Sequence, residues 1–202
     1  MKRITILVVL FVILVANITA CQSSYEENDM SSSTEWRQYR CDVKHLNLVT
    51  TIDVYKKGDK YRCIRGESIF LRSVHDPLKI YDVSGNLIAS AGDVYHFISQ
   101  DSHSVVDADG NLQIEMAGNI EIWGESYVLY NNEQSIIGYL YVGGTNTGGT
   151  IKDIEGDVIV KYTSSPLFDD YNVDISPNCQ INDDYILLLF ASYFSDIDAD
   201  RK

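Results

Sequence analysis

The sequence lacks the short motifs that mark the common hydrolases and nucleotide-binding proteins. None of Gly-x-Ser-x-Gly, Ser-x-x-Lys or His-Glu-x-x-His occurs in its 202 residues. The glycine-rich stretch 143–149 lacks the Lys-Ser/Thr ending that phosphate binding needs, so we interpret it as a linker. We therefore predict no catalytic residue and no cofactor. A Cys–His pair or two carboxylates that the fold brings together would still allow an enzyme.

Basic residues and prolines are also scarce. The chain has 16 Lys and Arg against 29 Asp and Glu, a formal net charge of −13 at pH 7. Nucleic acids attract proteins through basic surfaces, so this charge argues against a nucleic-acid partner. Only 3 prolines occur, and no Pro/Gly-rich break divides residues 36–202, so we expect one globular domain there.

The longest apolar run lies at the N-terminus, over residues 4–16, directly after two basic residues. The order that follows it resembles the bacterial lipobox, in which the cysteine is acylated and becomes the new N-terminus. We predict a lipoprotein signal peptide over 1–20, and an ordinary signal peptide cut at the same place is the alternative. The cleavage motif is Ile18, Thr19 and Ala20, and the lipid attachment site is Cys21.

Residues 21–35 are rich in serine and acidic residues and show no apolar periodicity, so we expect a disordered tether. The globular head then spans 36–202. Loss of the signal peptide would leave 14 basic against 29 acidic residues, a formal charge of −15. We expect the chain to lie at the bacterial cell membrane or outer envelope, facing outside the cytoplasm, with the membrane as a partner through its lipid.

Cysteines other than Cys21 number three: Cys41, Cys63 and Cys179. An exported chain permits a disulfide, and an odd count leaves one thiol over. Cys41 and Cys63 are the candidate pair, because the turn at 57–59 could bring their strands together. The alternative is no bridge at all, since a free cysteine packs well as a small apolar residue.

One turn phrase recurs four times between residues 82 and 158, at spacings of about two dozen residues. Each copy has Asp or Asn first and, in three of the four, Gly followed by Asn or Asp, residues that favour tight hairpin turns. The remaining copy, at 131–136, which is third along the chain, is degraded. The residues expected to close the hairpins are Asp82, Gly85, Asn86, Asp107, Gly110, Asn111, Asp153, Gly156 and Asp157.

Apolar residues alternate with polar ones between these turns, as in 112–116 and 120–123. This period of two is typical of strands with one buried face. Eight or more short antiparallel strands at such spacing predict a barrel or a sandwich.

The segment 183–196 departs from this pattern. It begins with two aspartates, which favour a helix N-terminus, and its middle is apolar on every side. A helix of this kind must be enclosed, so we expect it inside the β structure, although a strand over 186–190 is an alternative. The apolar residues of the expected helix are Ile186, Leu187, Leu188, Leu189, Phe190 and Phe194.

The repeated turns, the stretch 170–175 and the terminal apolar helix together resemble the tubby C-terminal-like superfamily, and within it the LURP-one-related branch. The resemblance covers roughly 51–198. It implies a mainly β fold, a closed antiparallel barrel of about twelve strands around one C-terminal helix. Tubby proteins bind phosphoinositides through basic side chains, and this sequence shows no basic cluster.

The related phospholipid scramblases carry a proposed calcium-binding stretch just before the helix. Asp169, Asp170 and Asp174 fall in the corresponding place. Calcium takes six to eight oxygen ligands, and three carboxylates on one strand do not supply them. We therefore predict no metal site and keep these residues as weak candidates.

From these features we expect a membrane-anchored, extracytoplasmic lipoprotein that serves as a non-catalytic binding or scaffold module of the cell envelope. Its partner would be an envelope protein or ligand that the sequence does not identify. One alternative is an envelope hydrolase. Another is a lipid-handling protein, by analogy with the scramblases.

Overall fold

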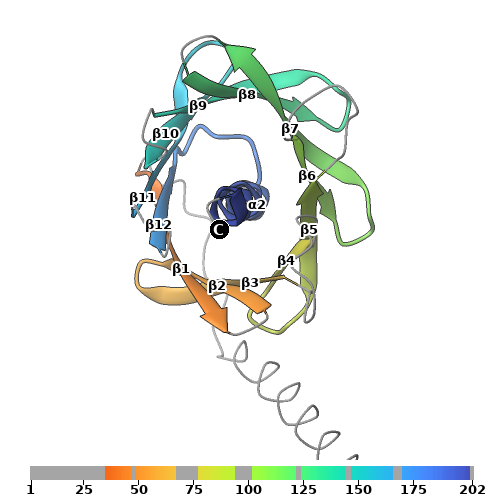
Figure 1. The fold of residues 1–202 in the computed structure, drawn as a ribbon, viewed down its shortest axis with the longest axis vertical. Helices are drawn as coiled ribbons and strands as arrows, with labels where there is room; N and C mark the ends of the chain where they lie inside the picture. The colour runs from red at the N-terminus through yellow and green to blue at the C-terminus, as the bar shows by residue number, and fades with distance from the viewer. Residues whose placement is uncertain are drawn as a thin grey trace, which may run out of the picture.

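The computed structural model describes residues 35–46, 49–66, 77–93, 102–121, 124–143, 147–165 and 170–200. The predicted signal peptide, the lipid attachment at Cys21, the tether up to residue 34 and Asp169 lie outside them. The described residues form a closed antiparallel barrel with helix α2 inside it (Figure 1). The predicted fold class is therefore confirmed.

The barrel has twelve strands in the described part of the chain. Their bounds are β1 Arg37–Leu46, β2 Val49–Lys56, β3 Asp59–Gly66, β4 Leu78–Tyr81, β5 Leu87–Asp93, β6 Ser102–Asp107, β7 Leu112–Glu121, β8 Gly124–Asn131, β9 Ile136–Val142, β10 Gly148–Lys152, β11 Val158–Ser164 and β12 Asp170–Ile175. The helix α2 spans Asp183–Asp200, so it is longer than the predicted 183–196.

Each strand pairs with the next one in sequence, and β1 closes the barrel by pairing with β12. Because neighbouring strands are antiparallel, the tight turns after β2, β4, β6, β8 and β10 all lie at one end, which we call the hairpin end. The segment that leads from β12 into α2 starts at this end too. The first turn of α2 therefore lies close to the hairpins.

The four repeated turns share one hydrogen-bond pattern. In the first, Gly85 N–H donates to the Asp82 carbonyl at 3.1 Å, and Asp82 N–H donates to the Asn86 carbonyl at 3.0 Å. The Asp82 carboxylate also accepts from Asn86 N–H at 2.8 Å. Gly85 has a φ of +85°, and the degraded copy places Gln134 at +60° in the equivalent position. The repeat is therefore a turn that needs one residue in the left-handed region.

The five hairpins that follow β2, β4, β6, β8 and β10 each carry a β-bulge two or three residues after the turn. The register skips one residue of the returning strand, and at four of the five positions this residue is apolar and packs in or against the core. A bulge re-aims a side chain toward the inside of the barrel. The skipped residues are Tyr61, Ile88, Gln113, Ile137 and Ile159.

Helix α2 fills the barrel as an apolar rod. Each side chain from Ile186 to Phe194 is buried, which fits a helix that is apolar all round. Aromatic rings join it to the wall: Phe190 lies 4.9 Å from the Tyr162 ring, and Phe194 lies 4.7 Å from the Tyr171 ring, between centroids. Among the described residues, no helical segment reaches the length and hydrophobicity of a membrane span.

The candidate disulfide between Cys41 and Cys63 is not formed. Strand β2 separates their strands, β1 and β3, so their backbones are about 10 Å apart. Cys41 lies opposite the inward Val54, whereas Cys63 lies opposite the outward Asp53. The two side chains thus face opposite sides of the wall. Burial raises the pKa of Cys41 to about 12.

Candidate functional site

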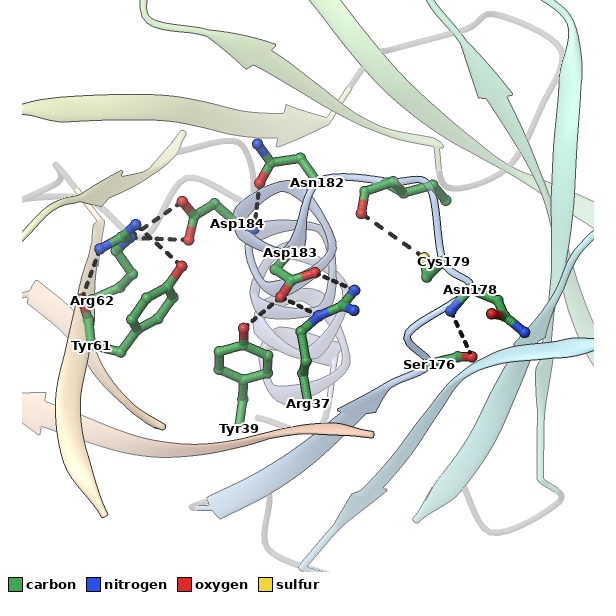
Figure 2. Close-up of polar contacts among 11 residues, drawn as sticks. Arg37, Tyr39, Tyr61, Arg62, Ser176, Asn178, Cys179, Asn182, Asp183 and Asp184 are labelled. Atoms are coloured by element: carbon green, nitrogen blue, oxygen red, sulfur yellow. Dashed lines mark hydrogen bonds and ion pairs between the residues drawn. The ribbon is translucent and has the colours of Figure 1, made fainter. Parts of the chain in front are cut away.

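Polar side chains inside the barrel gather around the first turn of α2, at the hairpin end (Figure 2). Asn182 caps the helix, because its side-chain oxygen accepts a hydrogen bond from Asp184 N–H at 2.9 Å. Asp183 and Asp184 follow in the first turn, where the partial positive charge of the helix favours carboxylates. The chain thus presents two adjacent acids to the barrel wall.

Asp183 is held by β1. Arg37 donates two hydrogen bonds to its carboxylate, at 2.8 and 2.9 Å, and the Tyr39 hydroxyl donates a third at 2.5 Å. Burial and the neighbouring Asp183 both raise the pKa of Tyr39 well above its usual value. The hydrogen bond to Asp183 raises the pKa of Arg37. Tyr39 therefore stays neutral and serves as a hydrogen-bond donor.

Asp184 is held by β3. The Arg62 Nε donates to both of its carboxylate oxygens, at 3.1 and 3.2 Å. The Arg62 guanidinium also lies over the Tyr61 ring, 3.9 Å from the centroid. Tyr61 is the bulged residue of this hairpin, so the bulge lets Tyr61 and Arg62 both reach the interior. Burial raises the pKa of Asp184, and the charge of Arg62 only partly offsets this.

A lysine completes this group of cations. The Lys56 ammonium lies 5.4 Å from the Tyr39 ring centroid and 5.2 Å from the Tyr61 ring centroid. Its charge also lowers the pKa of Asp184 slightly. Three cations and two tyrosines therefore lie around the helix start, and the cations offset part of the cost of burying its two carboxylates.

Cys179 lies on the segment that leads into α2 (Figure 2). Its thiol is buried and lies 3.9 Å from the Ile181 carbonyl oxygen. Burial raises the pKa of this thiol, so the reactive thiolate is disfavoured at neutral pH. A nucleophilic role for Cys179 finds no support in this geometry.

A buried Ser–His pair lies deeper in the barrel. His103 of β6 has its Nδ1 2.9 Å from the Ser192 Oγ of α2. The His103 ring also meets Tyr193 edge to face, with centroids 6.2 Å apart. His103 and Ser192 are only 1% and 5% exposed, so no substrate reaches them in this conformation. Their pairing joins the helix to the wall.

The weak calcium candidates do not converge. Asp170 and Asp174 are four residues apart on β12, which separates their backbones by about 13 Å on the same face. Asp170 lies instead 3.8 Å from the Arg40 guanidinium. Within the ranges that the structure describes, no group of three or more His, Cys, Asp or Glu side chains is arranged to hold a metal ion.

The sequence did not reveal the partners of the two helix acids. Arg62 and Asp184 are 122 positions apart, and Arg37 and Asp183 are 146 apart. The available signal was the acidic pair itself, because two carboxylates directly before an apolar, enclosed helix require buried cations. The basic residues of the strands could have been searched for positions that face inward.

Comparisons with known proteins bear on the fold. No protein-family model matches the chain, and no curated protein matches its sequence. The X-ray structure of an Arabidopsis thaliana protein, AT5G01750, is similar, with a TM-score of 0.54 and 10% sequence identity over 85% of this chain and 97% of that chain. At this level of identity the similarity shows that the two chains share a fold.

Proposed function

We propose that this chain is an exported lipoprotein whose tubby-like head acts as a non-catalytic binding or scaffold module at the cell envelope. The apolar run 4–16 and the lipobox-like order before Cys21 support export and lipidation. The acidic, serine-rich residues 21–35 would then link the lipid to the head. The barrel and the similarity to the Arabidopsis protein support placement in the LURP-one-related branch.

The main support for a non-catalytic role is that both carboxylates inside the barrel are paired with side chains of the wall. Asp183 and Asp184 have the burial that a catalytic acid needs, but Arg37, Tyr39 and Arg62 occupy their oxygens. These contacts fix the start of α2 to β1 and β3. These ion pairs account for the burial of both acids through the fold alone, without a catalytic role. Binding would therefore use the outer surface of the barrel.

Metabolic labelling with a clickable fatty acid tests the anchor. The full-length chain should be labelled in its host, and Cys21→Ser should lose the label because the acylated thiol is gone. Cys179→Ser is the matched control and should keep it, since Cys179 is buried in the head. Labelling of Cys21→Ser would contradict lipidation at this residue.

Photo-cross-linking in intact cells tests the binding role. A photoreactive residue at exposed Asn172, on the outer wall, should give a discrete adduct of the full-length chain with an envelope component. The same residue at exposed Asp109, in the hairpin turn after β6, is the control for random collision. Equal, diffuse adducts from both positions would contradict a specific binding module.

A further inference from the structure

The apolar side chains that the barrel leaves in solvent gather in one place. In the described part of the chain, the exposed large hydrophobic residues are Ile136 (43%), Tyr141 (43%) and Ile154 (62%). Two belong to β9, and Ile154 lies in the turn between β10 and β11. Single exposed apolar residues are ordinary, but a group on neighbouring strands indicates an interaction surface.

The outward residues of β9, β10 and β11 complete this surface. In each strand, the residues that alternate with core residues face outward. The register sets Thr150 of β10 between Tyr141 of β9 and Lys161 of β11, so one outward row crosses all three strands. Lys152 pairs with Tyr139 in the next row. The β9–β11 face consists of Ile136, Tyr139, Tyr141, Thr150, Lys152, Ile154 and Lys161.

The charges of this face are sorted by position. Its two lysines lie over aromatic rings: the Lys152 ammonium is 5.4 Å from the Tyr141 ring centroid, and the Lys161 ammonium is 4.7 Å from the Trp36 ring centroid. Neither lysine forms an ion pair with another described residue. Carboxylates lie at the border of the face, on β12 and in the adjoining turns: Asp174, Glu133, Glu155 and Asp157. The face therefore suits an occupant that is acidic in its middle and uncharged at its ends.

The described chain begins beside this face. Trp36 directly precedes β1, and β12 separates β1 from β11 in the barrel. The Trp36 ring nevertheless meets Lys161 of β11, so this contact spans β12. Residues 22–34 therefore join the head on the side where the β9–β11 face lies.

The charge pattern of residues 22–34 complements that of the face. The segment has no basic residue, and its three carboxylates fall within four positions: Glu26, Glu27 and Asp29. The stretches on either side, 22–25 and 30–34, are uncharged, so they would cross the acidic border without repulsion. Tyr25 and Met30 adjoin the carboxylates and suit the apolar part of the face.

The segment is long enough to reach both lysines. Asp29 lies seven positions before Trp36, and a chain of that length spans about 15 Å on average. Strand β9 is two strands from β11, about 10 Å away. We propose that residues 22–34 dock on the β9–β11 face, with the carboxylates of 26–29 beside Lys152 and Lys161. This docking needs no lipid at Cys21, and it competes with any other partner of the face.

Disulfide trapping in the full-length chain tests this proposal. Asn28→Cys combined with Thr150→Cys should give an intramolecular bridge under mild oxidation. Asn28→Cys combined with Lys79→Cys is the matched control. Lys79 lies on β4 between the core residues Leu78 and Ile80, so it faces outward as Thr150 does. Strands β4 and β10 are each three strands from β1, on opposite sides of it (Figure 1). Peptide mapping should show the bridge between 28 and 150 forming at least fivefold faster than the bridge between 28 and 79.

Charge reversal on the face separates docking from chance encounter. Lys152→Glu with Lys161→Glu should slow the bridge between 28 and 150 at least fivefold, because the carboxylates of 26–29 are then repelled. It should leave the bridge between 28 and 79 unchanged. Equal rates for the two cysteine pairs would overturn the proposal. So would a bridge between 28 and 150 that survives charge reversal, or one that joins two separate chains.

Discussion

Asp53 and Asp184 lie on opposite sides of the barrel wall and are almost equally hidden from solvent. Their side chains are 7% and 9% exposed. Asp53 lies on the outer side of β2 between Lys44 and Lys60, and Lys60 approaches it at 2.8 Å. Asp184 lies inside the barrel with Arg62 as its hydrogen-bonded cation. The two carboxylates therefore differ in the number of cations and in the depth of their surroundings.

Their pKa values move in opposite directions. Burial acts to raise the pKa of Asp53, but Lys44 and Lys60 outweigh it and the pKa is lowered. Burial raises the pKa of Asp184, and here Arg62 does not outweigh it. Exposed area alone thus does not decide how a buried acid ionises. The direction of the pKa shift depends on whether the nearby cations stabilise the charged carboxylate by more than its desolvation costs.

The largest loss of stability should come from placing a carboxylate in the core where no cation is near. Leu188 is fully buried in the middle of α2, among apolar side chains. Leu188→Asp should cost more than about 4 kcal/mol and prevent folding of the full-length chain, because nothing there compensates a charge. Circular dichroism during thermal unfolding measures this. Leu188→Met, which keeps the volume, should cost less than about 1.5 kcal/mol. An unchanged unfolding temperature in Leu188→Asp would refute the central position of α2.

A smaller effect should follow from removing one acid of the interior. Asp184→Ala leaves the Arg62 charge, whose side chain is only 20% exposed, without its carboxylate, and should cost about 3 kcal/mol. The double change Arg62→Met with Asp184→Leu should cost less than Asp184→Ala alone, since it removes both charges. Asp53→Ala should cost less, about 2 kcal/mol, because Lys44 is 49% exposed and stays solvated, whereas Lys60 is 20% exposed and loses a carboxylate partner. A double variant less stable than Asp184→Ala would contradict this account.

The smallest effect should be a difference in pH dependence. The folded pKa of Asp53 is lowered, so its stabilisation is present above the unfolded value of about 3.9 and is lost as the pH falls through the folded value. The folded pKa of Asp184 is raised, so its relative stabilisation is present below about 3.9 and is lost as the pH rises through the folded value. Urea unfolding from pH 3 to 7 should show the stability gap between the unchanged chain and Asp53→Asn widening with pH. The stability gap between the unchanged chain and Asp184→Asn should narrow as the pH rises. Parallel profiles for the two variants would contradict the opposite pKa shifts of Asp53 and Asp184.

The turns and the helix were predictable because their signals are local. Asp82 and Gly85 carry their turn chemistry within four positions, and the run from Ile186 to Phe190 shows its apolar character directly. The bulges were not predictable. Their extra residues, such as Ile88, look like ordinary members of an apolar alternation, and only the register of the partner strand shows which residue is skipped.

The disulfide prediction failed for a related reason. Closeness of two strands in sequence does not tell whether they are direct neighbours or which face each cysteine takes. Cys41 faces the interior, Cys63 faces out, and β2 lies between them. The interior ion pairs could not be predicted from local patterns either. Arg62 and Asp184 are 122 positions apart, and only the folded barrel brings them together.

The pairing of β1 with β12 also constrains the order in which the chain can assemble. Until residues 170–175 are in place, β1 has one unpaired edge, and an open edge is a template for association with other chains. Helix α2 follows β12, so the rod that fills the barrel is made after the twelve described strands. Closure joins strands that are more than 120 residues apart, which predicts slow folding. A chain cut before α2 would lack the centre of its core, so an intact α2 is a condition for the barrel to form.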